Sequence, residues 1–247
     1  MDTVRIFVGF DQREAAAYHV FCQSVIAKAT CPVSFHPIAR NMLNGLNSQQ
    51  DGTNAFTYSR YLVPYLCGFE GWALFVDGDM VVTEDIASLW AERARFQFNT
   101  AVAVVKHDYK TQHPVKYIGT KLENRNIDYP RKNWSSVMLW NCGHYANRLL
   151  LPDYVSTAGG EALHRFQWLK DSQIGELMPT WNHLVGEYPP GPANLYHYTL
   201  GVSGLKHYAD SNASWNWHRS LIQSLECGGE DALAMVNRSQ ERVGAVQ

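Results

Sequence analysis

An acidic tripeptide interrupts an apolar stretch in the first half of this chain. Residues 73–82 read ALFVDGDMVV, with Asp77 and Asp79 on either side of a glycine. An ionised carboxylate is costly to bury, so these side chains must lie at the wet end of a strand, become protonated, or face a cation. Two carboxylates about 4 Å apart repel by roughly 4 kcal/mol at an effective dielectric of 20. The segment therefore predicts a buried central strand that presents both carboxylates, on one side, to a positive group.

The remaining segments alternate between the patterns of strands and helices. Residues 3–10 predict a buried strand, and residues 11–29 predict a helix in which Asp11 caps the first turn and Glu14 completes a capping box. Strands that alternate with helices predict an α/β domain with a mostly parallel central sheet flanked by helices. The other expected elements are strands over 33–39, 100–106, 135–141 and 194–199, helices over 56–69, 83–90, 143–150 and 160–178, a long polar loop over 107–134, and a C-terminal helix with a tail.

Composition and charge limit the functions that this chain can have. At 247 residues, 46% of them hydrophobic, it suits one large domain over residues 1–247. The net charge is −2 with no long block of either sign, so no nucleic-acid partner is expected. No apolar run approaches the ~18 residues of a membrane span, and the first ten residues lack a signal-peptide core. Five cysteines without a CxxC pair indicate neither a disulfide framework nor a zinc site, so we expect a cytoplasmic protein.

The Asp-x-Asp pattern suits a hard divalent cation. Mg²⁺ and Mn²⁺ prefer oxygen ligands, and they need few protein groups when the phosphate oxygens of a substrate complete the coordination. In an open α/β fold, the strand before Asp77 would end at the carboxyl edge of the sheet, where ligands bind. Gly78 would let a ligand approach the backbone there. In the alternative interpretation both acids only solvate the end of a strand, because the tripeptide by itself is common.

Several segments, in the same order, resemble the family 8 glycosyltransferases. The block over 56–82 has Tyr-x-Arg before the Asp-x-Asp strand, as that family does, and IFVGFDQRE at 6–14 is similar to its first strand. The other matching segments are VMLWN at 137–141, LMPTWN at 177–182 and HYTLG at 197–201. The resemblance implies a GT-A type fold and the transfer of a sugar from a nucleotide-sugar, with a UDP-sugar as the expected donor. It also implies retention of configuration and a saccharide or other hydroxyl acceptor.

The resemblance, together with the chemistry of nearby side chains, implies a set of site residues. Mn²⁺ (or Mg²⁺) would be held by Asp77, Asp79 and His197. The expected nucleotide and donor residues are Phe10, Asp11, Arg13, Tyr58, Arg60, Asp77, Gly78, Lys106, Gly201 and Lys206. The expected acceptor residues are Trp181, Asn182 and His183, and the expected catalytic residues are Asp171 and Gln173. Residues 1–105 would form the nucleotide-binding half, 106–215 the acceptor and sugar half, and 216–247 a C-terminal helix and tail.

Departures from the family pattern affect the sugar and the stereochemistry. Ser172 and Gln173 replace the Gln-Asp that follows the first acid of the family's Asp-Gln-Asp, and Trp134-Ser-Ser replaces an Asn-x-Gly. Asp171 could instead act as the base for an acceptor hydroxyl, as an inverting transfer requires. The polar loop over 109–133 is either a lid that orders around an anionic ligand or a solvated loop.

Two other classes of function fit some of the same residues. LFVDGDMVV also fits the Asp-x-Asp signature of haloacid-dehalogenase-type phosphatases, in which Asp77 would be a covalent nucleophile. That signature normally ends the first strand, whereas here a strand and a helix precede it. A non-catalytic carbohydrate-binding module would explain the eight Trp residues and the 13% aromatic content, but would not require the acids, Arg60 and His197 together.

Overall fold

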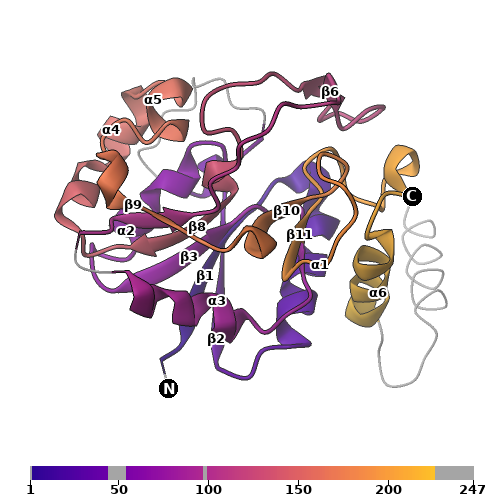
Figure 1. Cartoon of the computed structure of the whole chain (residues 1–247), viewed down its shortest axis with the longest axis horizontal. Coiled ribbons are helices and arrows are strands. Elements are labelled where there is room, and N and C mark those ends of the chain that lie inside the picture. The colour runs from indigo at the N-terminus through magenta and orange to yellow at the C-terminus, as the bar shows by residue number, and fades with distance from the viewer. Residues whose placement is uncertain (1, 44–53, 97–98, 226–247) are drawn as a thin grey trace, which may run out of the picture.

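The computed structural model describes residues 2–43, 54–96 and 99–225, which form a central sheet with helices on both faces (Figure 1). The expected C-terminal tail after residue 225 lies outside the described residues. The six-stranded sheet has the order β2 (Val33–Ile38), β1 (Val4–Gly9), β3 (Trp72–Val76), β8 (Val137–Asn141), β5 (Val102–Val104) and β9 (Ile174–Glu176). Only β8 runs antiparallel to its neighbours. The predicted α/β fold with a mostly parallel sheet is therefore confirmed.

Alternating side chains of the sheet build a core on each face. Phe7, Phe75 and Trp140 pack on one face, beneath the 3-10 helix η3 (Ser59–Leu62) and helices α2 (Val63–Leu66), α4 (Pro152–Thr157) and α5 (Gly160–His164). Ile6 and Leu74 pack on the opposite face, against α1 (Ala15–Ile26) and α3 (Ile86–Ala91). Successive residues of a strand point to opposite faces, so these uniformly apolar strands are buried on both sides.

A second, smaller sheet lies beside the first. It contains β10 (His183–Leu184), β11 (Leu195–His197) and β4 (Met80–Val82), and α6 (Ser214–Leu225) packs beside α1 at the edge of the molecule (Figure 1). A two-stranded hairpin of β6 (Val115–Lys116) and β7 (Asn124–Arg125) lies within the segment expected to be a polar loop. Within the described residues, no helix is both long and apolar enough to span a lipid bilayer.

The expected strand over 73–82 is wrong as a single element. β3 ends at Val76 and β4 begins at Met80 in the other sheet, so residues 77–79 form the connection between the two sheets. The N–H of Asp77 donates to the Ser136 carbonyl, whereas the Asp79 carbonyl accepts from the N–H of Tyr198. The chain therefore changes its hydrogen-bonding partner within the acidic tripeptide.

Two helix predictions are also corrected. The helix expected over 160–178 ends after α5 because Phe166 has a left-handed backbone conformation, and residues 174–176 form β9 beside β5. The capping box at Glu14 does not form: the Asp11 side chain accepts from the N–H of Arg13 in a short 3-10 turn, η1 (Gln12–Glu14), and α1 begins at Ala15. The Glu14 carboxylate lies instead near the acidic tripeptide.

We expect Gly78→Ala to destabilise the fold because a Cβ at this position would lie 2.4 Å from the backbone carbonyl oxygen of Gly9. Such overpacking typically costs about 1–3 kcal/mol of unfolding free energy, which urea denaturation would measure. The control is Gly191→Ala, where the nearest neighbouring atom is 4.0 Å from the added Cβ. Equal stability of both variants would contradict the close packing of β1 against the tripeptide.

Candidate functional site

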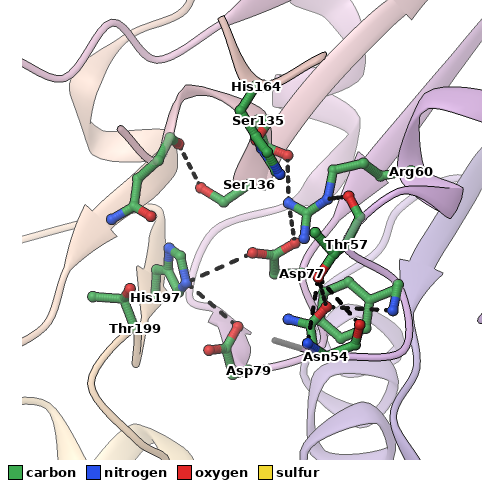
Figure 2. A network of polar contacts seen from close by, with 12 residues as sticks. Asn54, Thr57, Arg60, Asp77, Asp79, Ser135, Ser136, His164, His197 and Thr199 are labelled. Carbon is green, nitrogen blue, oxygen red and sulfur yellow. Dashed lines mark hydrogen bonds and ion pairs between the residues drawn. The ribbon is translucent and has the colours of Figure 1, made fainter. Parts of the chain in front are cut away.

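Asp77, Asp79 and His197 meet where the two sheets join. The acids come from the connection between β3 and β4, and His197 is the last residue of β11, which pairs with β4. The Nε2 atom of His197 lies 3.4 Å from Oδ1 of Asp79 and 4.0 Å from Oδ2 of Asp77 (Figure 2). One ligand atom from each residue lies within 4.8 Å of the other two, and all three residues are buried. This triad has the spacing of ligands around one ion.

A chain of hydrogen bonds determines which nitrogen of His197 faces the acids. The Ser136 hydroxyl donates to the Asn133 carbonyl at 2.6 Å, so its oxygen accepts the Asn182 amide N–H at 2.8 Å. The Asn182 carbonyl oxygen then accepts a hydrogen bond from Nδ1 of His197 at 3.0 Å. With the proton on Nδ1, the lone pair of Nε2 points toward the carboxylates, as metal ligation requires.

Buried carboxylate oxygens of this site lack hydrogen-bond donors. Oδ1 of Asp79 and Oε2 of Glu14 accept no hydrogen bond, and Oδ1 of Asp77 has only an ion pair with Arg60 at 2.8 Å. Unsatisfied buried oxygens are costly unless a cation or an ordered water neutralises them. The oxygen-rich donor set with one imidazole fits Mg²⁺ or Mn²⁺, so these residues can hold a divalent ion.

Arg60 holds one side of the acidic pair. Its guanidinium donates to the carbonyls of Thr57 at 3.1 Å and Ser135 at 2.9 Å, and it makes cation–π contacts with the rings of Phe56 and Phe75. These contacts orient the guanidinium toward Asp77 (Figure 2).

The two acids differ in their electrostatic environment. Burial raises the pKa of Asp77 to about 6, although Arg60 opposes the shift. Burial also acts to raise the pKa of Asp79, but in the absence of an ion a protonated His197 ring and the Tyr117 hydroxyl outweigh it, so this pKa is lowered. Asp79 is therefore the stronger anion of the pair.

Three residues of the site were not among the predicted site residues: Glu14, Lys116 and Tyr117. The sequence placed Lys116 only within the loop over 109–133 that could order around an anionic ligand. The Tyr117 hydroxyl donates to Oδ2 of Asp79 at 2.8 Å, and the Lys116 ammonium donates to the Thr199 hydroxyl at 3.1 Å. Burial and the Asp79 carboxylate raise the pKa of Glu14 well above its usual range. No local motif marks these residues, although the left-handed backbone of Tyr117 is an unusual conformation of the kind often found at functional sites.

A cavity of about 410 Å³ adjoins the triad and shares Asp77 with it. Three of the predicted donor residues, Tyr58, Arg60 and Asp77, line this cavity, together with His164. Burial lowers the pKa of His164 to about 3, so its ring is neutral. The volume is in the range of small-molecule sites.

Asp11 and Arg13 lie near the triad but outside this cavity. Arg13 forms a bidentate ion pair with Asp11, in which Nε donates to Oδ1 at 2.9 Å and Nη2 donates to Oδ2 at 2.6 Å. The backbone N–H of Ala55 also donates to Oδ2 of Asp11. Burial acts to raise the pKa of Asp11, but these donors lower it overall. Arg13 lines a second cavity, of about 680 Å³, which also includes Glu14 and Tyr117.

A small cleft around the triad is lined by Asp77, Asp79, His197, Glu14, Lys116 and Tyr117, among others. Apart from the triad itself, the remaining predicted site residues line neither this cleft nor the 410 Å³ cavity. Asp171 is exposed and pairs with Arg131, and the buried Gln173 donates to the Tyr145 hydroxyl. Asn182 supports His197 from behind, as described above. The others lie as follows: Phe10 against Tyr18, Lys106 over Trp134, Trp181 in the core, His183 between Tyr188 and Tyr196, Gly201 against Tyr208, and Lys206 on the surface.

Comparison with known proteins identifies a relative in sequence. No protein-family model matches the chain. Protein CDI of Arabidopsis thaliana is 39% identical over 208 residues, which cover 80% of this chain and 78% of that protein. The chain belongs to the Protein CDI family.

Solved structures place this Protein CDI family member among GT-A folds. The bifunctional glycosyltransferase WbbM matches with a TM-score of 0.61 and 14% identity, over 89% of this chain and 49% of that one. The glycosyltransferase GlyE of Streptococcus pneumoniae TIGR4 matches with a TM-score of 0.57 and 14% identity, over 98% of this chain and 64% of that one. The galactosyltransferase LgtC matches with a TM-score of 0.54 and 12% identity, over 90% of this chain and 95% of that one. The chain spans about half the length of WbbM and under two thirds of GlyE, and it has the GT-A fold.

We expect Asn182→Ala to weaken Mn²⁺ binding about 10- to 100-fold, because loss of a hydrogen-bonding partner behind a histidine ligand typically has this effect. Isothermal titration with Mn²⁺ would measure the affinity. The matched control is Asn147→Ala, which also removes a fully buried amide, one that donates to the carbonyls of Ala101 and Asn141 away from the triad. Equal Mn²⁺ affinity in the Asn182 variant and the control would contradict the orienting role of Asn182.

Proposed function

We propose that this protein is a metal-dependent glycosyltransferase that transfers a sugar from a nucleotide-sugar to an acceptor hydroxyl. The main support is the buried triad of Asp77, Asp79 and His197, in which Oδ1 of each aspartate accepts no hydrogen bond, at the junction of two sheets in a GT-A fold. The cavity beside the triad offers room for a substrate. An ion at the triad would require phosphate oxygens to complete its coordination, and a nucleotide-sugar supplies them.

The chemistry follows from where charge develops. When bound, Mn²⁺ or Mg²⁺ would offset the negative charge that grows on the departing nucleoside diphosphate. Arg60 keeps Asp77 in place, Tyr117 orients Asp79, and Asn182 orients His197. The Lys116 ammonium lines both the triad cleft and the cavity, so it can approach the diphosphate. The protein would otherwise hold the acceptor hydroxyl against the anomeric carbon.

We propose a UDP-sugar donor and retention of configuration, on the basis of the resemblance to family 8. Inversion requires a general base beside the acceptor hydroxyl. Among the described residues, the carboxylates that line the cavity belong to Asp77 and Glu161, and each pairs with an arginine, Arg60 and Arg165 respectively. The exposed carboxylate of Asp171 lies outside the cavity. This arrangement favours retention.

The other two classes of function have less support. A haloacid-dehalogenase-type nucleophile must be able to attack a phosphate, but Asp77 follows a later strand of a GT-A fold and pairs with Arg60. A carbohydrate-binding module needs no triad of this kind. We place the protein in the cytoplasm, in keeping with the free thiols of the described cysteines.

We expect Asp79→Asn and His197→Ala to reduce Mn²⁺-dependent UDP affinity at least tenfold, because each removes one ligand of the ion. Titration of UDP with and without Mn²⁺ would measure this, and a thermal melt would confirm that both variants fold. The control is Asp210→Asn, an exposed acid that lines neither the cavity nor the cleft around the triad. Undiminished Mn²⁺-dependent UDP affinity in both site variants would rule out the metal assignment.

A further inference from the structure

The cleft around the triad and the adjoining cavity have opposite charge. Three acidic residues, Glu14, Asp77 and Asp79, line the cleft together with one basic residue, Lys116. Five basic residues line the 410 Å³ cavity, and only two acids accompany them. The basic residues are Arg60, Lys116, Arg125, Lys132 and Arg165, and the acids are Asp77 and Glu161.

Four of these basic residues line the cavity but not the cleft, and one of them, Arg60, is already paired with Asp77. The other three are Arg125, Lys132 and Arg165. A diphosphate bridged to an ion at the triad would lie at the cleft, where Lys116 can reach it. The three remaining cations would then face whatever group extends from the diphosphate into the cavity. Their charge is therefore available to a different part of the substrate.

The hydrogen-bonding capacity of these three residues is incompletely used. Arg125 has no hydrogen bond or ion pair from its guanidinium to the part of the chain that the structure describes. Nε of Arg165 is buried and has no acceptor, although its terminal nitrogen pairs with Glu161. The Lys132 side chain is 5% exposed. Its Nζ atom donates to the side-chain oxygen Oδ1 of Asn126 at 2.7 Å and lies 3.5 Å from Oδ1 of Asp128. Burial lowers the pKa of Lys132, so a bound anion would stabilise its charged form.

The rest of the cavity suits a sugar ring. Two aromatic residues, Tyr58 and Tyr129, line it together with the polar residues Thr57 and Asn124. Aromatic faces pack well against the apolar faces of sugars, while polar side chains can bond ring hydroxyls. The cavity thus combines sugar-binding groups with an excess of positive charge.

We propose that this cavity accepts a sugar with an anionic substituent, a carboxylate or a phosphate, rather than a neutral sugar. The inference rests on the proposed function, since it assumes that a diphosphate occupies the triad cleft. The anionic group would pair with Arg125 and Arg165, which line the cavity but not the cleft, and Lys132 would contribute a third positive charge.

Binding to the whole protein in the presence of Mn²⁺ tests the proposal. We expect either UDP-glucuronate to bind at least tenfold more tightly than UDP-glucose, or, with UDP already bound, glucuronate or glucose 6-phosphate to bind at least tenfold more tightly than glucose. The first result would assign the anionic sugar to the donor and the second to the acceptor. Absence of discrimination in both comparisons, with UDP still bound in a Mn²⁺-dependent way, would overturn the proposal alone.

Two variants separate an anionic sugar from the alternative that these cations bind the diphosphate. Arg125→Gln and Arg165→Gln should each reduce the preference for the anionic sugar about tenfold, the effect of losing a charged hydrogen bond, and leave UDP affinity unchanged. Arg148→Gln is the control, because Arg148 lies over Phe69 and lines neither cavity nor cleft. An equal loss of UDP affinity in the two cavity variants would overturn the proposal. Absence of any Mn²⁺-dependent UDP binding in the unaltered protein would instead overturn the proposed function on which it rests.

Discussion

The repulsion between two buried carboxylates, Asp77 and Asp79, is the constraint to which the surrounding structure responds. They are 9% and 6% exposed, so water can screen little of their charge. The neighbouring elements supply positive or donor groups instead: Arg60 from η3 faces Asp77, and the Tyr117 hydroxyl from the β6–β7 hairpin donates to Asp79. Several carboxylate oxygens still lack a donor. A bound cation would complete this compensation.

The triad depends on contacts between segments that are far apart in the sequence. Ser136, directly before β8, orients Asn182, which in turn orients the ring of His197 on β11. The hairpin that holds Lys116 and Tyr117 is itself anchored, because the buried carboxylate of Glu187 accepts hydrogen bonds from Gln112 and Asn126. The segment over 109–133 is therefore neither a freely solvated loop nor independent of the site.

Acidic residues gather in the cleft on one side of Asp77, and basic residues gather around the cavity on the other side. Asp77 and Arg60 form the boundary between the two sides, through a buried ion pair at 2.8 Å. Removing one partner of such a pair would leave an uncompensated charge, so both sides depend on this contact.

The sequence by itself determined the sheet class and the two acids that follow an apolar strand, because apolar periodicity and short motifs are local properties. His197 was assigned to the triad only through the resemblance to family 8, since a single histidine carries no local motif. The sequence did not show that the apolar run breaks at residues 77–79, that residues 174–176 form an edge strand, or that Glu14 turns toward Asp79 instead of capping a helix. Those features depend on partners more than 50 residues away, such as Ser136 for Asp77 and Val102 for Ile174. Only the tertiary structure decided that Lys116 and Tyr117 reach the triad while Asp171 and Lys206 face solvent, because the direction of a side chain on a loop is set by packing against distant segments.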